Sequence, residues 1–389
     1  MSSLKIPNKD ARRLWLASHG LRQAPTGKSD ALGTIEALGF VQLDTIQVIA
    51  RAHHHILWSR DQTYREPVLN KLLSKDRAVF EHFTHDASVL PMAYLSMWQR
   101  QFRRMKEKVE RSSWFGNALP RIDLDAILRR ITDEGPLSTK DFETKPTGKR
   151  DMWERPSHKV GLDYLWYSGQ LATCHRDGFI KYYDLAERVF PDQFRAQTMA
   201  DKDQIDWLCD AALLRLGFGT LGEIRKFWDA TAVAEVSDWA RRRADGLVPV
   251  KIEDATGNWT PAYACAEIET RLAQVGSSSS RLRILNPFDP AIRDRLRLKR
   301  LFGFEYTVEM FVPEAKRKWG YYIYPLLDAD RFVGRLEAKA MREKDVLNVT
   351  RIWWEPGVQV TENRLKRLKA EVKRLARLAG VSRVNWMAG

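Results

Sequence analysis

Cysteine is scarce in this chain of 389 residues. The three present, Cys174, Cys209 and Cys265, lie far apart and form no CxxC pair. A disulfide framework needs closely spaced cysteines, and a cysteine zinc site needs paired thiolates. The sequence therefore indicates neither, and it fits a reducing cytoplasm.

Long apolar runs are also missing. No stretch approaches the ~18 residues of a membrane span, and the first residues, MSSLKIPNKDARRLWL, lack the apolar core of a signal peptide. We expect a cytoplasmic protein of the bacterial, nucleoid-associated type that has no membrane contact.

The motifs of the commonest enzymes are absent. We find no P-loop, no GxGxxG, no serine or cysteine nucleophile motif and no HExxH. The absence of these motifs excludes only enzymes that carry them in readable form, and not the chemistries themselves. We predict neither a cofactor nor a metal site.

Positive charge and aromatic side chains are abundant instead. The 64 Lys and Arg residues exceed the 50 Asp and Glu residues, which gives a net charge of +14, and 14 tryptophans argue against disorder. This charge favours a polyanionic partner, most commonly nucleic acid. A basic enzyme without such a partner is equally compatible with the charge alone.

A pattern of helices followed by two strands recurs three times, which predicts winged helix-turn-helix units. The clearest copy should contain helices at 122–135, at 139–142 after a Ser138 cap and at 157–169, then two strands around an Asp177-Gly178 turn. The second copy should contain helices at 203–219, 220–230 and 235–246 and strands at 247–254 and 258–264. The less regular N-terminal copy should contain helices capped by Asn8 and Asp30, and long helical segments from about 66 to 110.

After the polar GSSSS of residues 276–280, the sequence pattern changes from mainly helical to mainly strand-like. Strand-like runs follow at 305–312, 320–327, 331–340 and 347–355, ahead of a helix at 363–380 whose basic face should be solvated. The predicted fold is α+β, with three tandem winged helix-turn-helix domains followed by a C-terminal β-rich, β-barrel-like domain. The expected domains are 1–120, 121–197, 198–276 and 281–389. Tandem winged helices also serve structural roles, so the repeat alone does not decide for DNA binding.

Gln42 and Asp44 stand two residues apart in the apolar run GFVQLDTIQV at 39–48. They would point ~200° apart on a helix but share a face on an extended segment. If they cooperate, the segment is extended, with Val41 and Leu43 packed inward and Phe40 facing the same space as the pair. The spacing alone does not distinguish them from surface or capping residues.

One carboxylate and one amide suffice for a restricted class of hydrolysis. Ordinary glycoside hydrolysis uses two carboxylic groups, because the leaving oxygen must be protonated. A purine alkylated at N7 or N3 is already cationic. Its excision then requires only stabilisation of an oxocarbenium-like sugar and delivery of water.

Histidines and a basic cluster are further candidates. His53, His54 and His55 would fan out on a helix and cannot all bind one ion, whereas His82 and His85 have the spacing of one helical face. We interpret the histidines as DNA-facing or supporting polar groups. Lys316, Arg317 and Lys318, beside Trp319, should lie at the tip of a hairpin that can enter a DNA groove.

At this point the chain resembles the YcaQ-type (AlkX) winged-helix DNA glycosylases, relatives of AlkZ. The matching stretches run in order along nearly the whole chain and are DARRLWLASHGL, VQLDTIQVIARAHHHILWSR, FEHFTHDASVLP, WERPSHKVGLDYLWYSGQL, LNPFDPAIRDR and GYYIYPLL. The resemblance implies three winged helices with a C-terminal β-domain. It also implies a catalytic Q-x-D motif at Gln42 and Asp44, where the AlkZ branch carries Q-x-Q.

The resemblance implies a monofunctional, metal-independent hydrolysis in double-stranded DNA. Its substrates would be N7-alkylguanines and nitrogen-mustard-type interstrand crosslinks, with Asp44 stabilising the sugar cation and activating water that Gln42 positions. Further DNA-binding or supporting candidates, from their places in the matching stretches, are Arg51, His53, His54, His85 and Asp86. We expect a monomer.

Two alternatives remain open at this point. A non-catalytic winged-helix DNA-binding regulator explains the charge and the wings, but not an acid in an apolar segment. A metal-dependent nuclease rests on the histidines alone.

Overall fold

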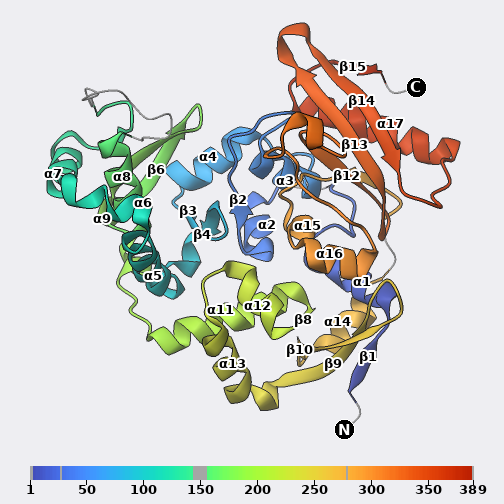
Figure 1. Ribbon diagram of the computed structural model, residues 1–389, viewed down its shortest axis with the longest axis horizontal. Helices are drawn as coiled ribbons and strands as arrows, with labels where there is room; N and C mark the ends of the chain where they lie inside the picture. The colour runs from blue at the N-terminus through green and yellow to red at the C-terminus, as the bar shows by residue number, and fades with distance from the viewer. Residues whose placement is uncertain (1–2, 27–28, 143–155, 277–278, 388–389) are drawn as a thin grey trace. The chain divides into compact units, whose positions relative to one another are not determined.

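The computed structural model describes residues 3–26, 29–142, 156–276 and 279–387, and the chain divides into two compact units (Figure 1). Unit 1 comprises Met1–Arg65, Ala211–Ile224 and Ser237–Gly389, and unit 2 comprises Glu66–Asp210 and Arg225–Val236. Each unit mixes helices and strands, so the fold is α+β as predicted. The number of winged helices and the four domain boundaries stay predictions.

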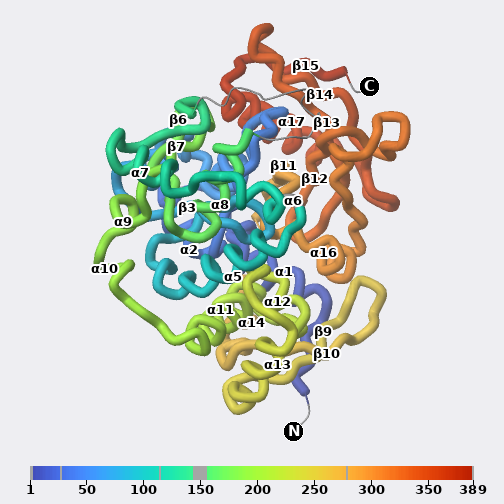
Figure 2. The backbone as a smooth tube through the Cα atoms, turned by 60° about the vertical axis from the view of Figure 1, so that its left-hand side comes forward, coloured from blue at the N-terminus to red at the C-terminus, as the bar shows by residue number. Residues whose placement is uncertain are grey.

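Unit 1 contains a four-stranded sheet in which the N-terminal strand joins a hairpin from the middle of the chain. The strand order is β1 (Leu4–Ile6), β9 (Leu247–Glu253), β10 (Trp259–Cys265) and β8 (Phe218–Gly219). β1 runs parallel to β9, with Leu4 opposite Val250, and Figure 2 shows the two side by side. The β9–β10 hairpin was predicted; its partner β1 was not.

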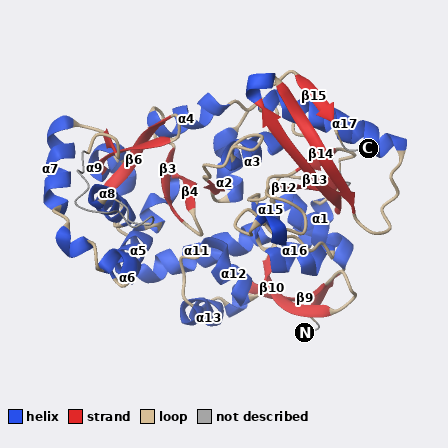
Figure 3. Cartoon of the chain, turned by 45° about the horizontal axis from the view of Figure 1, so that its top comes forward, coloured by secondary structure: helices blue, strands red, loops and turns tan. Residues whose placement is uncertain are grey.

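The C-terminal part of unit 1 is β-rich, as predicted. Its five-stranded sheet has the order β11 (Leu282–Ile284), β12 (Ile323–Asp328), β13 (Arg331–Met341), β14 (Val346–Trp354) and β15 (Arg383–Trp386). All neighbours are antiparallel except β14 and β15. Helix α17 (Glu362–Leu378) packs on this sheet (Figure 3). Its apolar stripe includes the fully buried Leu368 and Val372. The polar run at 276–280 lies partly outside the described residues.

The remaining helices of unit 1 surround these sheets. They are α1 (Asn8–Ser18), α2 (Ala31–Leu38), α3 (Ala52–Arg60), α14 (Ile268–Gln274), α15 (Pro290–Arg293) and α16 (Arg295–Phe302). Asp30 caps α2 as predicted, since its carboxylate accepts the Gly33 N–H. Asn8 does not cap α1. Its amide donates instead to the carbonyls of Glu253 and Leu301, which ties α1 to distant parts of the chain.

Three predicted helices contribute residues to both units. They are α11 (Asp201–Leu216), α12 (Leu221–Trp228) and α13 (Val233–Arg242).

Unit 2 contains the clearest predicted repeat. Helices α7 (Leu124–Glu134) and α8 (Ser157–Tyr167) pack with the hairpin of β6 (Leu171–Asp177) and β7 (Ile180–Leu185) around one apolar core. The hairpin turn falls one residue later than predicted. Its central residues, Gly178 and Phe179, both have positive φ, as a tight two-residue hairpin requires.

The helix expected at 139–142 is wrong. Leu137–Ser138 forms strand β5, which pairs with β7, and residues 139–142 form a turn. The Asp141 carboxylate accepts both the backbone N–H and the hydroxyl of Ser138 at 2.7 Å, so these side chains close the turn instead of starting a helix.

The helical segment expected from 66 to 110 is interrupted. Between α4 (Glu66–Ser74) and α5 (Gln99–Glu110), the chain forms the antiparallel strands β3 (Val79–Phe83) and β4 (Ala87–Pro91). This hairpin buries four apolar residues, Val79, Phe80, Val89 and Leu90. Tertiary packing therefore favours strands here over the predicted helix. Short helices in unit 2 are α6 (Ser113–Gly116), α9 (Ala186–Val189) and α10 (Asp192–Arg195).

None of the helices in the described ranges is long and apolar enough to cross a membrane.

Candidate active site

The Q-x-D segment begins where α2 ends. Gly39 stops the helix with a φ of +86°, and its N–H donates to the carbonyls of Ile35 and Glu36. Glycine reaches this left-handed conformation without strain. The chain then enters the short strand β2 (Val41–Gln42) and continues without helix as far as Arg51. The expectation of a non-helical segment holds.

Val41 and Leu43 are buried, as predicted. Phe40 is also buried, as is Gln42, which is 7% exposed, whereas Asp44 is half-buried. The Phe40 ring lies under the Arg293 guanidinium, whose central carbon is 5.1 Å from the ring centre. The motif therefore runs from the interior of the protein, where Gln42 is buried, toward the surface, where Asp44 is half-buried.

Asp44 is held by its own backbone. One carboxylate oxygen accepts the N–H of Ile46 at 2.6 Å, which forms an Asx turn. Residues Thr45 and Gln47 on either side of Ile46 are exposed. The carboxylate is thus fixed in direction at a position that solvent reaches.

A buried tyrosine lies near this carboxylate. Burial raises the pKa of Tyr322, and the negative charge of Asp44 raises it further. The Tyr322 hydroxyl lies 3.3 Å from the Asn286 amide nitrogen, and Asn286 is fully buried. Tyr322 is therefore a neutral phenol at physiological pH, and its hydroxyl lies 3.4 Å from the Asn286 amide oxygen, to which it can donate.

The end of the segment is fastened to the C-terminal sheet. The Val48 carbonyl accepts the N–H of Ala340 at 3.0 Å, and the Ile49 carbonyl accepts the Arg342 guanidinium. Because Ala340 at the end of β13 and Arg342 just after it bind these two carbonyls, the segment that carries the motif is anchored by residues nearly 300 positions away in sequence.

The three consecutive histidines lie on α3, immediately after this segment, and are buried. His54 Nδ1 lies 2.8 Å from the Tyr64 hydroxyl, and His55 Nε2 lies 3.0 Å from the Ile284 carbonyl. His53 is 2% exposed and its ring contacts that of His54. Arg51, half-buried at the start of α3, is close enough for its charge to affect His54. His53, His54 and His55 thus lie in the interior of unit 1 and not on its surface, where a DNA-facing role would require them.

This burial predicts a pH dependence of stability. Burial lowers the pKa of His54 to about 3 and that of His55 to about 4, against roughly 6.5 in an unfolded chain. Below pH 6.5 the unfolded chain binds protons that the folded chain does not. The stability that these rings contribute is therefore complete above about pH 6.5 and falls as the pH drops, by up to ~1.4 kcal/mol per pH unit for each ring.

Urea unfolding measured from pH 7 to pH 4.5 tests this. We expect His54→Gln to flatten the pH dependence by about one proton. An identical slope in wild type and His54→Gln would contradict the assignment.

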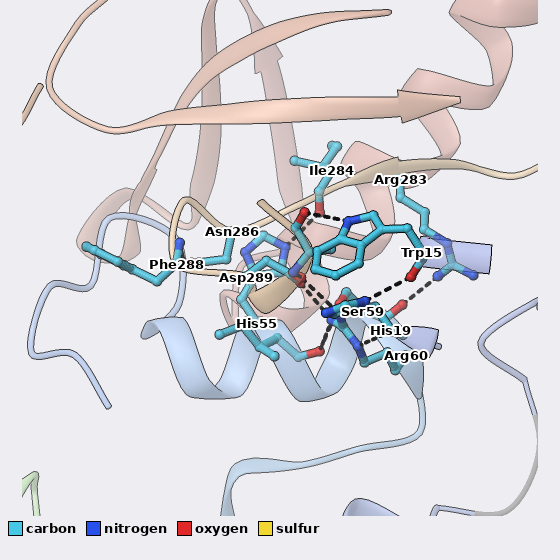
Figure 4. Close-up of polar contacts among 12 residues, drawn as sticks. Trp15, His19, His55, Ser59, Arg60, Arg283, Ile284, Asn286, Phe288 and Asp289 are labelled. Atoms are coloured by element: carbon cyan, nitrogen blue, oxygen red, sulfur yellow. Dashed lines mark hydrogen bonds and ion pairs between the residues drawn. The ribbon is translucent and has the colours of Figure 1, made fainter. Parts of the chain in front are cut away.

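A buried ion pair joins α3 to the loop before α15 (Figure 4). The Arg60 guanidinium donates to both carboxylate oxygens of Asp289, at 2.7 and 2.9 Å. Burial by itself would raise the pKa of Asp289, but the Arg60 charge and its hydrogen bonds lower it, so the carboxylate stays ionised. Arg60 also donates to the His19 carbonyl. The loop that carries Asn286 is thereby locked to the helix that follows the motif.

Arg60→Ala should therefore destabilise unit 1 by ~3–5 kcal/mol, because it leaves a fully buried carboxylate without its counterion. Chemical denaturation of wild type and variant measures the loss. The control is Lys299→Ala, which removes the exposed ion pair with Glu305 in the same unit and should cost much less. Equal effects of the two substitutions would contradict a structural role for the Arg60–Asp289 pair.

His82, His85 and Asp86 belong to unit 2. His82 lies in strand β3 and not on a helix; it is fully buried and accepts the Trp98 indole N–H at 2.9 Å. His85 and Asp86 lie in the turn between β3 and β4, where His85 contacts the Phe227 carbonyl at 3.3 Å. The helical face predicted for His82 and His85 is therefore wrong.

The basic cluster lies on a loop, not at the tip of a hairpin. Residues 303–322 contain no strand, so the predicted strand at 305–312 is wrong. Its organiser is Glu309, whose buried carboxylate accepts the backbone N–H groups of Lys318, Trp319 and Gly320 at 2.8–3.1 Å. Side-chain bonds of this kind compete with strand pairing. Lys316 and Lys318 are exposed on this loop.

Sequence reasoning missed the residues that support the motif, namely Tyr322, Asn286, Arg60, Asp289 and Glu309. Four of them fall in or beside matching stretches, but nothing in their local spacing reveals which partner each one contacts. In the described ranges, no group of three or more His, Cys, Asp or Glu side chains is arranged to hold a metal ion.

The fold and the site geometry can now be compared with known proteins. The structure of the Streptomyces sahachiroi DNA glycosylase AlkZ is similar over 99% of this chain and 100% of that chain, with a TM-score of 0.65 and 15% sequence identity. At this identity the likeness shows a shared fold, that of a DNA glycosylase. The family model described as DNA glycosylase AlkZ-like matches residues 35–378.

The chain therefore belongs to the AlkZ-like DNA glycosylase family. The recognition of this family from the sequence is confirmed. The matched range includes Gln42, Asp44 and the loop at 303–322. Membership implies an enzyme that acts on DNA; the lesion and the catalytic residues are separate questions.

Proposed function

We propose that this protein is a monofunctional DNA glycosylase that hydrolyses the N-glycosidic bond of cationic, N7-alkylguanine-type lesions in double-stranded DNA. The observation that carries the proposal is the placement of Asp44, a half-buried carboxylate held by the Ile46 N–H at the surface end of the Q-x-D segment. Within an AlkZ-like family, this is the carboxylate that the chemistry of a cationic leaving group requires.

The proposed reaction needs few groups. As the C1′–N9 bond breaks, the bond electrons neutralise the alkylated purine and C1′ becomes electron-deficient, and the Asp44 carboxylate stabilises this centre electrostatically. Water then adds to C1′ and loses a proton to Asp44. The Gln42 amide, two residues before Asp44, positions that water. The products are a free base and an abasic site.

We also propose that Asp44 places the protein with the AlkX branch, which carries Q-x-D and unhooks interstrand crosslinks. DNA contacts are assigned to Arg51, His85, Lys316, Arg317, Lys318 and Trp319, and the protein acts as a monomer in the cytoplasm.

The test is incubation with duplex DNA containing N7-methylguanine in the presence of EDTA. We expect abasic sites that alkali converts to strand breaks. Binding without product would instead identify a regulator, and strand nicking that appears only when a divalent metal is restored would identify a nuclease. Either result would overturn the proposed function.

A further inference from the structure

One apolar side chain is fully displayed on the surface of unit 1. Phe311 is 86% exposed, more than any other large apolar side chain in the described ranges. It lies in the loop between α16 and β12, five residues before Lys316. Exposure of a whole phenyl ring to water costs free energy, which burial of the ring against a partner would recover.

Hydrogen bonds hold the loop around Phe311 in a defined conformation. The Val312 N–H donates to the Glu309 carbonyl at 2.9 Å, and the Val312 carbonyl accepts the Arg317 guanidinium at 2.8 Å. The Glu309 carboxylate binds three backbone N–H groups further along the loop; burial raises its pKa, but these bonds lower it below the ordinary value. Phe311 therefore projects from a turn that is braced on both sides.

Arg317 binds the carbonyl of the residue next to Phe311, and two lysines follow on the same loop, which also carries the exposed Glu314. Lys316 and Lys318 are exposed, and the Arg317 guanidinium lies 5.2 Å from the centre of the Tyr321 ring. An apolar ring bordered by cations matches a base stack between two phosphate backbones. It matches an apolar protein groove less well, since the cations would then lose water without gaining phosphates.

The same loop leads directly to the candidate active site. It ends at Tyr321 and Tyr322, and Tyr322 is the phenol whose pKa the charge of Asp44 helps to raise. Both the Asp44 segment and the loop belong to unit 1.

We propose that Phe311 inserts between stacked base pairs beside the lesion and opens that step, so that the damaged sugar can approach Asp44. This inference rests on the proposed function and adds the way in which the substrate is held. An apolar wedge can unstack and kink a duplex without swinging a nucleotide fully out of it.

The test measures unstacking by binding alone. Duplex DNA carries a stable abasic analogue with 2-aminopurine as its neighbour, because the fluorescence of 2-aminopurine rises when it unstacks. We expect wild type and Phe311→Trp to raise the fluorescence on binding, and Phe311→Ala to abolish the rise and to bind about fivefold or more weakly. Lys316→Ala should keep the rise but reduce the salt dependence of binding by about one unit of log-log slope.

The matched control is Leu296→Ala, which removes another exposed apolar side chain, 76% exposed, from α16. It should leave both fluorescence and affinity unchanged. A persistent rise with Phe311→Ala, or no rise when wild type binds, overturns the wedge. If wild type unstacks the DNA but excises no lesion, the wedge stands and the proposed function fails.

Discussion

Asp44→Asn is expected to lower the single-turnover rate of N7-methylguanine excision by about 100-fold or more, the scale of losing a charge-stabilising and base group. Asparagine keeps the oxygen that accepts the Ile46 N–H, so the turn should survive. The negative charge opposite the sugar cation is lost. Binding to lesion-containing DNA should therefore change little while the chemical step slows.

The chain offers a matched control for this substitution. Asp254 also accepts the N–H of the residue two positions later, Thr256, at 2.8 Å, but in an exposed hairpin turn. Asp254→Asn should excise at the wild-type rate. Gln42→Ala should slow excision less than Asp44→Asn, because it misplaces water without removing charge. Near-normal excision by Asp44→Asn would discard Asp44 as the catalytic residue.

The parts of the fold that were predictable are those in which local signals agree with burial. In α7, Ile127 and Ile131 recur on one face and form the core that the periodicity indicates. Helix α17 similarly buries Leu368, Val372 and Leu375 on its apolar stripe. Capping by Asp30 is another local signal that tertiary structure leaves intact.

The errors arise where contacts between residues far apart in sequence determine the local structure. Residues 305–312 have the composition of a strand, but the Glu309 carboxylate binds backbone groups about ten residues later, and no sequence window reports this. The three histidines of α3 look like polar surface residues by composition. They are buried because α3 itself lies inside unit 1, where carbonyl and hydroxyl groups of other segments meet their rings.

The candidate site divides in the same way. Gln42 and Asp44 could be named as candidates from the residues, but a Q-x-D spacing has little meaning by itself, and only the resemblance implied that the pair is catalytic. Their supports, Tyr322 and Asn286, come from segments more than 240 residues later, and the fold alone brings them to one unit. A single sequence carries no direct record of such pairs.

Crosslinks pose a geometric problem that the placement of the motif addresses. A guanine tethered through N7 to the opposite strand cannot swing into a closed pocket, as ordinary base flipping requires. An enzyme that unhooks such a lesion must bring its carboxylate to a base that stays near the helix axis. Asp44 is half-buried and lies beside the exposed Thr45, so solvent reaches this part of the segment. The buried Gln42 need reach only the water or the sugar.

We therefore expect the protein to convert a nitrogen-mustard crosslink between N7 guanines into separable strands, one of which carries an abasic site. Denaturing gels of a duplex labelled on both strands, run with enzyme in excess and in EDTA, would show the loss of the slowly migrating crosslinked species. Asp44→Asn should slow unhooking by the same factor as it slows excision of the monoadduct, since one carboxylate serves both reactions, and Asp254→Asn should unhook normally. If monoadducts are excised while the crosslinked duplex stays intact, Asp44 must be acting on a base that has left the helix, and a closed-pocket glycosylase of monoadducts becomes the better description.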